Sequence, residues 1–294
     1  MPTVAGRRPR GPGRPPAERV RERLAAVAGP EVAAAMPTGY QRLGRVLLLR
    51  LPEGFRPYFS VLGAAWTREL GVASVLVRVG PVDGEFRRPQ VERIAGDATE
   101  TEVVEHGIRW RFDAARLMFA AGNRTERRRA GGLVRPGETV VDLFAGIGYF
   151  AVPAARVGRA ARVLAVEKNP EAYRYLRENA ALNGVADRIE PVLGDNRAVP
   201  LSAGVADHVF LGYLPDATPW VARAVPLLRS EGGQLHVHCV ADARGGREAA
   251  VLRASAAARA AGARPNGPAS AREVKPYGPG RVHVVVDLPL RPPA

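Results

Sequence analysis

Two acidic residues end two apolar runs of this sequence, 25 positions apart, and a glycine-containing loop follows the first. Asp142 ends the first run, Gly146 and Gly148 lie in the loop, and Glu167 ends the second run. Glycine lets a backbone turn tightly and approach a ligand closely. A carboxylate that ends the second strand of a Rossmann-type unit binds ribose hydroxyls. The pattern therefore predicts a nucleoside pocket.

The loop departs from the dinucleotide-binding pattern G-x-G-x-x-G, because Ala151 or Val152 occupies the place of the third glycine. Asp142 would face a pyrophosphate, so a cationic ligand suits the loop better. The D-x-F-A-G-x-G form is similar to the S-adenosylmethionine (SAM) site of class I methyltransferases. The alternative is an α/β domain in which the glycines only make a turn. The cofactor residues expected around this loop are Asp142, Phe144, Ala145, Gly146, Gly148, Glu167 and Lys168.

The elements that must hold these residues alternate between strands and helices. Residues 169–184 predict a helix that begins near Pro170 and stops at Gly184. The next strand ends at Asp195 and Asn196, at the sheet edge where ligands bind in such folds, and an acid there can accept a hydrogen bond from an adenine amino group. Residues 206–215, 234–240 and 281–288 predict the remaining strands. The fold class is α/β, Rossmann-like, with residues 131–294 as its catalytic domain.

Two further segments precede this domain. Residues 1–35 are rich in arginine and proline and predict a disordered basic tail. Residues 36–130 predict a small α+β domain with strands at 46–49 and 74–78, two strands hinged at His106 and Gly107, and a linker helix. Asn123 can cap that helix, whose first amides could hold a methionyl carboxylate or a phosphate. The alternative is a solvated charged linker.

The composition limits the function classes. A formal charge of +14 and a pI near 11.0 favour nucleic acid as a partner. Arginine supplies nearly all of the positive charge, because lysine occurs only at positions 168 and 275. Part of the excess of positive charge therefore reflects the overall amino-acid composition. Without an apolar run of about 18 residues, the sequence predicts a cytoplasmic protein without a membrane segment. Cys239 is the single cysteine, and His236 and His238 lack an evident third ligand, so no metal site is predicted. A monomer is expected.

Seven spaced segments carry a more specific resemblance, over roughly residues 45 to 290. In order, they resemble the wybutosine-pathway tRNA aminocarboxypropyltransferases and the related tRNA guanosine-37 N1-methyltransferases. The segments are residues 84–89, 96–101, 105–108, 118–127, 141–150, 194–196 and 274–280. The resemblance implies SAM as the cofactor and tRNA as the partner.

The two branches differ after the fourth strand. The methyltransferase branch carries an Asn-Leu-Pro-like motif, and this sequence has Gly212 at the asparagine position, followed by Tyr213 and, two residues later, Pro215. The Gly-Tyr form is similar to the aminocarboxypropyltransferase branch, which we favour. The alternatives are N1-methylation of tRNA guanosine, alkyl transfer to another acceptor, and an idle RNA-binding protein.

By the same resemblance, four residues would contact SAM, with Arg127 at the methionyl carboxylate or an RNA phosphate; they are Arg127, Glu167, Asp195 and Asn196. Gly212 would lie beside the cofactor, and Asn123, Tyr213 and Pro215 would contact the acceptor. One departure is Ala120, where the family carries serine. The catalytic base is unknown: Asp113 and Glu126 are candidates by position only.

Overall fold

The computed structural model describes residues 14–293 and divides into two compact units. The first contains the described residues up to 102 and residues 113–118; the second contains residues 103–112 and the described residues from 119 onward. This division differs from the predicted boundary between residues 130 and 131. The helix before the pocket strand belongs to the second unit, because it packs on the helix that follows that strand.

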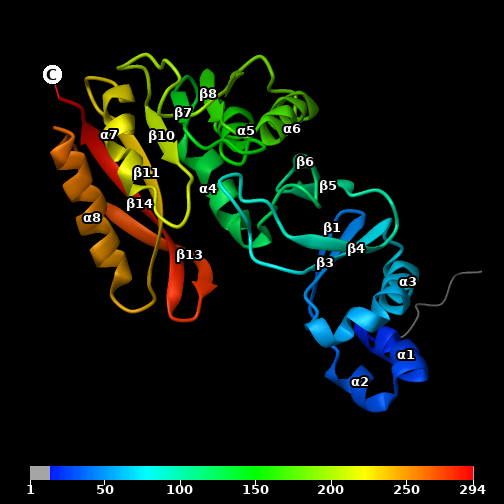
Figure 1. The fold of residues 1–294 in the computed structure, drawn as a ribbon. Helices are drawn as coiled ribbons and strands as arrows, with labels where there is room; N and C mark the ends of the chain where they lie inside the picture. Colours follow the sequence, from blue (N-terminus) through cyan, green and yellow to red (C-terminus); the bar gives the residue numbers. More distant parts are fainter. Residues whose placement is uncertain (1–13, 294) are drawn as a thin grey trace, which may run out of the picture. The chain divides into compact units, whose positions relative to one another are not determined.

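The first unit combines helices with a four-stranded mixed sheet of order β1-β2-β3-β4 (Figure 1). Only the β2 and β3 pair is parallel in this sheet. Its elements are α1 (Pro16–Ala28), α2 (Pro30–Ala35), β1 (Tyr40–Leu43), β2 (Val46–Leu49), the 3-10 helix η1 (Glu53–Tyr58), α3 (Phe59–Leu70), β3 (Ser74–Arg78) and β4 (Val91–Ala95).

The predicted disorder of residues 1–35 is wrong for residues 16–35, which form α1 and α2. Val20 and Leu24 lie one turn apart on α1 and are fully buried. The arginines of α1 are not all solvated, since Arg19 and Arg23 both pair with Glu69 of α3. The segment was predicted as disordered because it is rich in arginine, although its apolar residues lie on one face of a helix. Residues 1–13 of the predicted tail lie outside the described residues.

A hairpin of β5 (Glu100–Glu105) and β6 (Ile108–Asp113) leads into the second unit. Its turn lies where the sequence predicted it: His106 has φ 51° and Gly107 has φ 78°. The remaining elements are η2 (Ala121–Asn123), α4 (Arg124–Leu133), β7 (Thr139–Asp142), α5 (Ala151–Arg156), β8 (Arg162–Glu167), α6 (Pro170–Leu182), β9 (Ile189–Leu193), β10 (His208–Leu211), η3 (Thr218–Trp220), α7 (Val221–Ala224), η4 (Val225–Leu227), β11 (Gly233–Asp242), α8 (Gly246–Ala260), β12 (Arg264–Pro265), β13 (Ser270–Gly278) and β14 (Arg281–Arg291).

The large sheet of the second unit has the order β12-β14-β11-β10-β7-β8-β9, with β13 paired to β14 (Figure 1). From β11 to β9 the strands are parallel, and β14 runs antiparallel to β11. The chain starts at β7, builds β8 and β9 on one side, and then crosses to β10 and β11 on the other. Ligands bind at the carboxyl ends of strands beside such a reversal. The predicted Rossmann-like α/β class is confirmed.

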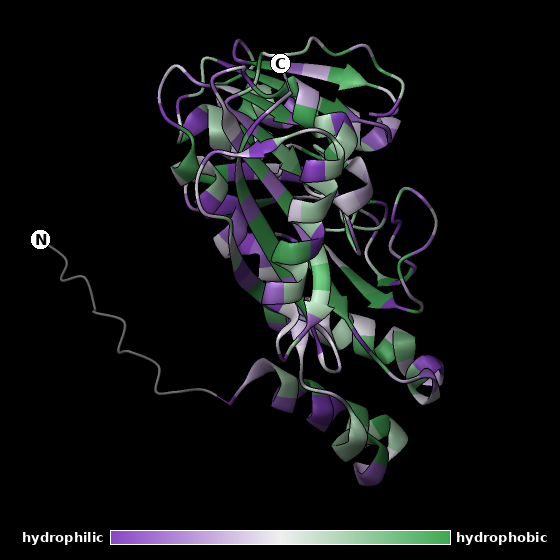
Figure 2. Cartoon of the chain, turned by 90° about the vertical axis from the view of Figure 1, so that its left-hand side faces the viewer, coloured by the Kyte–Doolittle hydropathy of each residue, from purple (hydrophilic) through white to green (hydrophobic). Residues whose placement is uncertain are grey.

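Both faces of this sheet are covered, so its central strands read as continuous apolar runs. All four residues of β10 are buried, and Val141, Val209, Leu235 and Val286 have no exposed surface. Figure 2 shows long stretches of hydrophobic colour along the strands, whereas the helices carry both hydrophobic and polar colour. Within residues 14–293, no helix is both long and apolar enough to cross a membrane.

Candidate active site

The loop after β7 turns sharply at its two glycines. Gly146 has φ 56° and Gly148 has φ 101°, a region that side chains other than glycine rarely adopt. A Cβ on Gly148 would also lie 2.7 Å from Cγ2 of Val152 on α5. Ala145 N–H donates to the Val166 carbonyl at 2.9 Å, which fixes the loop against β8. The glycines are therefore structural requirements of this turn.

Glu167 lies at the end of β8 and holds the loop through its carboxylate. Gly146 N–H donates to Oε2 at 2.7 Å, and Asn169 N–H donates to Oε1 at 2.7 Å. Burial raises the pKa of Glu167, and the backbone N–H groups of Asn169, Gly146 and Lys168 oppose that rise. Each oxygen retains lone pairs, so the carboxylate can still accept from two ligand hydroxyls.

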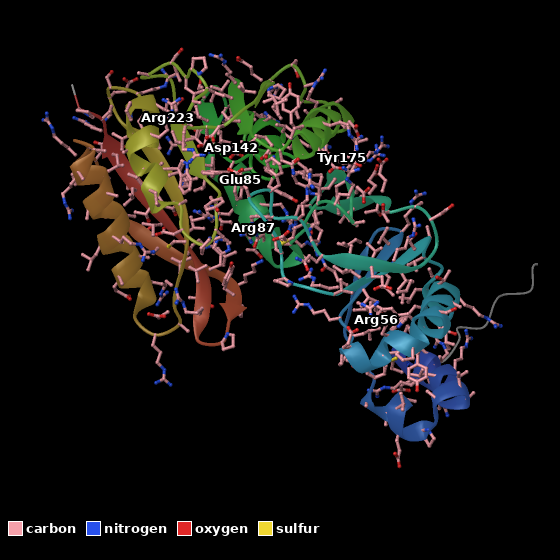
Figure 3. All side chains as sticks on the ribbon, viewed as in Figure 1. Arg56, Glu85, Arg87, Asp142, Tyr175 and Arg223 are labelled. Atoms are coloured by element: carbon pink, nitrogen blue, oxygen red, sulfur yellow. The ribbon has the colours of Figure 1, made fainter. Side chains whose placement is uncertain are left out.

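Asp142 is a fully buried acid with an unpartnered oxygen. Its Oδ1 accepts from Phe144 N–H at 3.1 Å, while Oδ2 has no hydrogen-bond partner. Burial raises the pKa of Asp142 to about 7 and the charge of Glu167 adds to the rise, while the nearby backbone N–H groups of Phe144 and Ala151 oppose it. Figure 3 locates the residue within the sheet of the second unit. A buried acceptor without a partner is costly, so this atom marks a position for a donor or a cation.

The segment after β9 supplies a second unpartnered oxygen. Asn196 donates from Nδ2 to the Leu143 carbonyl at 2.7 Å, next to Asp142, and its buried Oδ1 has no partner. Asp195 differs, because it accepts from Lys168 Nζ at 2.9 Å and from Arg197. Hydrogen bonds from Arg197 and Lys168 hold the pKa of Asp195 well below its ordinary value. Of the two residues predicted to contact adenine, Asn196 has the available acceptor.

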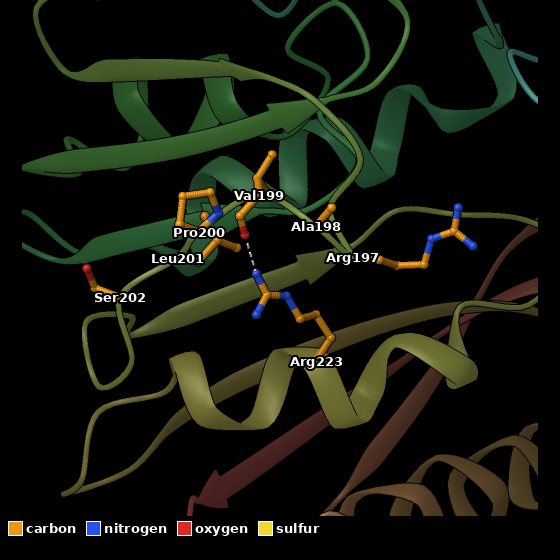
Figure 4. Close-up of a pocket in the computed structure, with 7 residues that line it drawn as sticks. All are labelled: Arg197, Ala198, Val199, Pro200, Leu201, Ser202 and Arg223. Carbon is orange, nitrogen blue, oxygen red and sulfur yellow. Dashed lines mark hydrogen bonds between the residues drawn. The ribbon is translucent and has the colours of Figure 1, made fainter.

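Arg223 of α7 holds this segment in place. Its Nε donates to the Asn196 carbonyl at 3.0 Å and its Nη2 to the Val199 carbonyl at 2.6 Å. Figure 4 shows Arg223 reaching across to this segment. Both line an open pocket of about 410 Å³. Neither Asp142 nor Glu167 lines that pocket. We therefore assign the nucleoside position to the carboxyl ends of β7, β8 and β9 instead.

Three aromatic rings pack together beside the loop. Phe144 lies 5.2 Å from Tyr213 and 5.2 Å from Trp220, between ring centroids, and Tyr213 lies 5.0 Å from Trp220. All three rings are partly exposed, and Pro215 is exposed. Sequence reasoning missed Trp220; an aromatic residue five positions after the Leu-Pro pair was the available signal. The loop after β10 thus offers flat apolar surface of the kind on which bases stack.

Gly212 is packed where a side chain would collide. A Cβ there would lie 2.7 Å from Cε2 of Phe150 and 3.8 Å from the Phe144 carbonyl oxygen. Phe150 is itself buried, with Phe210 at 5.4 Å and His238 at 5.0 Å between ring centroids. Glycine is therefore the residue that this packing accepts.

Arg127 is buried and already paired. Its Nε and Nη2 donate to Glu105 Oε2 at 2.9 and 2.6 Å, and its Nη1 donates to the Ala120 carbonyl at 3.1 Å. The guanidinium also lies 4.5 Å from the Phe119 ring centroid and 5.6 Å from that of Tyr149. Sequence reasoning missed Glu105, which neutralises this charge. The geometry favours a positioning role for Arg127 over direct contact with an anion.

Asn123 occupies the predicted N-cap position of α4 but makes no capping hydrogen bond. Its Oδ1 is buried without a partner, which suits a donor on a bound molecule. Glu126 does not suit the role of a base, because Arg129 donates to it at 2.8 Å and Arg272 lies 3.3 Å away. Asp113 belongs to the first unit, where its Oδ1 accepts from Ala115 N–H.

The buried histidines form two imidazole pairs. His236 Nε2 lies 3.0 Å from His208 Nδ1, and His238 Nδ1 lies 2.9 Å from His283 Nε2. Asp287 lies 2.6 Å from the other nitrogen of His236. Within residues 14–293, no group of three or more such side chains is arranged to hold a metal ion.

Acid should destabilise the fold through these histidines. Burial lowers the pKa of His208 to about 4 and that of His283 to about 4. The ordinary value is about 6.5, so stability is fully present above that pH and is lost as the pH falls towards 4. From pH 7 to pH 5, each of these histidines should lower the free energy of unfolding by about 2 kcal/mol. Urea unfolding at pH 7 and pH 5 measures this effect. The free energy of unfolding should fall less between these pH values for His283→Gln than for the wild type. His106→Asn, at an exposed turn, should show the same fall as the wild type.

Comparisons with known proteins agree with this geometry. Residues 101–263 match the model of the TRM5/TYW2 methyltransferase domain, and residues 20–99 match that of the TYW2 N-terminal domain. A relative from Pyrococcus horikoshii, named tRNA(Phe) (4-demethylwyosine(37)-C(7)) aminocarboxypropyltransferase, is 37% identical over 75% of this chain and 78% of its own.

Two solved structures are also similar. Pyrococcus horikoshii TYW2 in complex with MeSAdo has a TM-score of 0.81 and 31% identity, over 94% of this chain and 99% of that one. Trm5b from Pyrococcus abyssi has a TM-score of 0.76 and 28% identity, over 89% and 78%. The chain therefore belongs to the TRM5/TYW2 methyltransferase domain family, with a TYW2 N-terminal domain before it.

Proposed function

We propose that this chain is a SAM-dependent transferase that moves the 3-amino-3-carboxypropyl group of SAM onto a tricyclic guanosine derivative at position 37 of tRNA. The observation that carries the proposal is the pair of buried, unpartnered oxygens, Asp142 Oδ2 and Asn196 Oδ1, beside the Glu167 carboxylate. SAM offers ribose hydroxyls, an adenine amino group and positive charge. These groups are what such a set of acceptors requires.

Each residue then has a defined task. Glu167 accepts from the ribose hydroxyls while it holds Gly146 N–H. Asn196 Oδ1 accepts from the adenine amino group, and Arg223 keeps that segment in register. Asp142 supplies negative charge towards the cationic end of the ligand. Arg127, held by Glu105, positions the chain before α4, where Asn123 Oδ1 has no partner in the protein and can accept from a donor on the acceptor base.

The reaction depends on which carbon of the sulfonium faces the acceptor. When the acceptor carbon attacks the methionyl γ-carbon in line, a carbon–carbon bond forms and the carbon–sulfur bond breaks. The electron pair stays on sulfur, which leaves as the neutral thioether methylthioadenosine, and the acceptor carbon loses its proton to a base. The protein contributes by orientation and by excluding other geometries. Gly212, packed on Phe150, supports the aminocarboxypropyl branch, since that space cannot hold an asparagine side chain.

The tRNA assignment rests on the named relative and on the formal charge of +14. It is tested with SAM labelled in its carboxyl carbon and tRNA that carries the tricyclic base. Label should enter that tRNA and should not enter tRNA with an unmodified guanosine at position 37. Incorporation of label into neither tRNA, with SAM binding intact, would redirect the search to another acceptor.

We further propose that the chain acts as a monomer in the cytoplasm.

The resemblance to the tRNA guanosine-37 N1-methyltransferases, together with the match to the TRM5/TYW2 domain, favours one alternative, N1-methylation of guanosine 37 in tRNA. Methyl-labelled SAM distinguishes it, because methylation would place that label in tRNA with an unmodified guanosine.

A further inference from the structure

Two asparagines four residues apart pair with strand β6: Asn179 on the last turn of α6, and Asn183, which caps the end of that helix. Asn179 has no exposed surface and Asn183 is 3% exposed. Burying a carboxamide costs free energy unless its hydrogen bonds are made. Both side chains make three, and both pair with the strand in the same way.

Each carboxamide pairs with a strand residue as a peptide group would. Asn183 Oδ1 accepts from Arg109 N–H at 2.9 Å and Nδ2 donates to the Arg109 carbonyl at 2.7 Å. Asn179 does the same with Arg111, at 2.7 and 3.1 Å. Four residues of a helix rise about 6 Å, and two residues of a strand about 6.8 Å, so the spacings match. α6 thus replaces a neighbouring strand at the edge of the hairpin.

The two asparagines differ in the acceptor of their third hydrogen bond. Asn183 donates it to the Asn179 carbonyl at 2.8 Å, at the carboxyl end of α6. Asn179 donates it to the Ile147 carbonyl at 3.0 Å, between Gly146 and Gly148. One buried side chain therefore joins the glycine loop directly to β6.

The hairpin meets the same loop again at its other end. Glu105 on β5 holds Arg127, whose guanidinium lies against the ring of Tyr149, the residue after Gly148. Trp110 on β6 lies 5.9 Å from Tyr149 between ring centroids. The loop is thus fastened to the hairpin on two sides.

We propose that Asn179 is a positioning residue that sets the glycine loop for SAM binding by latching it to the β5–β6 hairpin. The inference rests on the proposed function, because it takes SAM as the ligand of the loop. Asn183 makes the same number of side-chain hydrogen bonds, and none of them reaches the loop. It is therefore the matched control that the chain itself provides.

The experiment measures SAM dissociation constants by calorimetry and unfolding by urea for Asn179→Ala and Asn183→Ala. Both variants lose three side-chain hydrogen bonds, so their unfolding midpoints should fall by similar amounts. Asn179→Ala should raise the Kd of SAM about tenfold, equivalent to about 1.4 kcal/mol. Asn183→Ala should change it less than about twofold, by the same conversion. Asn179→Asp, of equal size, should weaken SAM binding as Asn179→Ala does, because a carboxylate cannot donate to Ile147.

Equal Kd values for the two alanine variants would overturn the latch and leave Asn179 as a packing residue. If Asn179→Ala does not fold, the comparison of Asn179→Asp with Asn183→Asp decides in the same way. Absence of SAM binding by the wild-type protein would instead contradict the proposed function.

Discussion

Replacing Asp142 by asparagine is expected to weaken SAM binding while making the ligand-free protein more stable above neutral pH. A hydrogen bond to a charged group contributes about 1.5–3 kcal/mol, so the Kd of SAM should rise roughly 10- to 150-fold. The cause is the loss of a carboxylate whose Oδ2 is buried without a partner in the protein. A residue that costs stability and improves binding is a sign of a functional site.

The pH dependence gives this prediction its sign. The pKa of Asp142 is raised to about 7, against an ordinary value near 3.9. The folded state therefore holds a proton that the unfolded state releases, and stability is lost as the pH rises through 7. The stability difference between Asp142→Asn and the wild type should widen by about 2–3 kcal/mol from pH 5 to pH 8.

Urea unfolding at both pH values measures that difference, and calorimetry measures the Kd. The wild-type protein should also bind SAM more tightly as the pH rises through 7, because a cationic ligand competes with the proton. Asp142→Asn should lose this pH dependence. If the stability difference between Asp142→Asn and the wild type did not change with pH, and the Kd of SAM were unchanged, Asp142 would have only the local structural role of accepting from Phe144 N–H.

Placing a methyl group on Gly212 should have the second large effect. The new Cβ would lie 2.7 Å from Phe150, whose ring is held by Phe210 and His238. Overpacking of this kind costs about 1–3 kcal/mol of folding stability. Where the strain displaces Phe150 and the loop after β10, the same free energy is the upper bound on the lost transition-state stabilisation, so kcat/KM should fall by up to roughly 150-fold. Gly212→Asn should lose at least as much and should not gain methylation.

The double variant Gly212→Ala with Phe150→Leu provides the control, since leucine removes the ring carbon that the Cβ would meet. It should recover most of the activity of Phe150→Leu alone. If Gly212→Ala alone retained full activity, the packing at this position would not select the reaction.

Local patterns predicted the arrangement of the glycine loop between its two strands. The strand–loop–strand order placed Asp142, Gly146 and Glu167 together, because a turn and two neighbouring strands fix their geometry within a short stretch. Asn169 caps α6 as its type and place predict, with its side chain accepting from Glu171 N–H at 3.0 Å.

Contacts between distant segments could not be predicted in this way. Glu105 and Arg127 pair through a buried ion pair, and Asn179 reaches both Arg111 and Ile147. No single-sequence pattern marks an asparagine that stands in for a strand. β13 was likewise missed as a strand, because its residues are exposed or partly exposed and do not alternate.

The central claim is tested most directly by identifying the nucleoside that SAM leaves behind. The purified protein is incubated with SAM and tRNA carrying the tricyclic base, and the small-molecule product is identified by mass. Aminocarboxypropyl transfer predicts methylthioadenosine, in an amount equal to the modified base. S-adenosylhomocysteine in its place would contradict the account and establish methyl transfer.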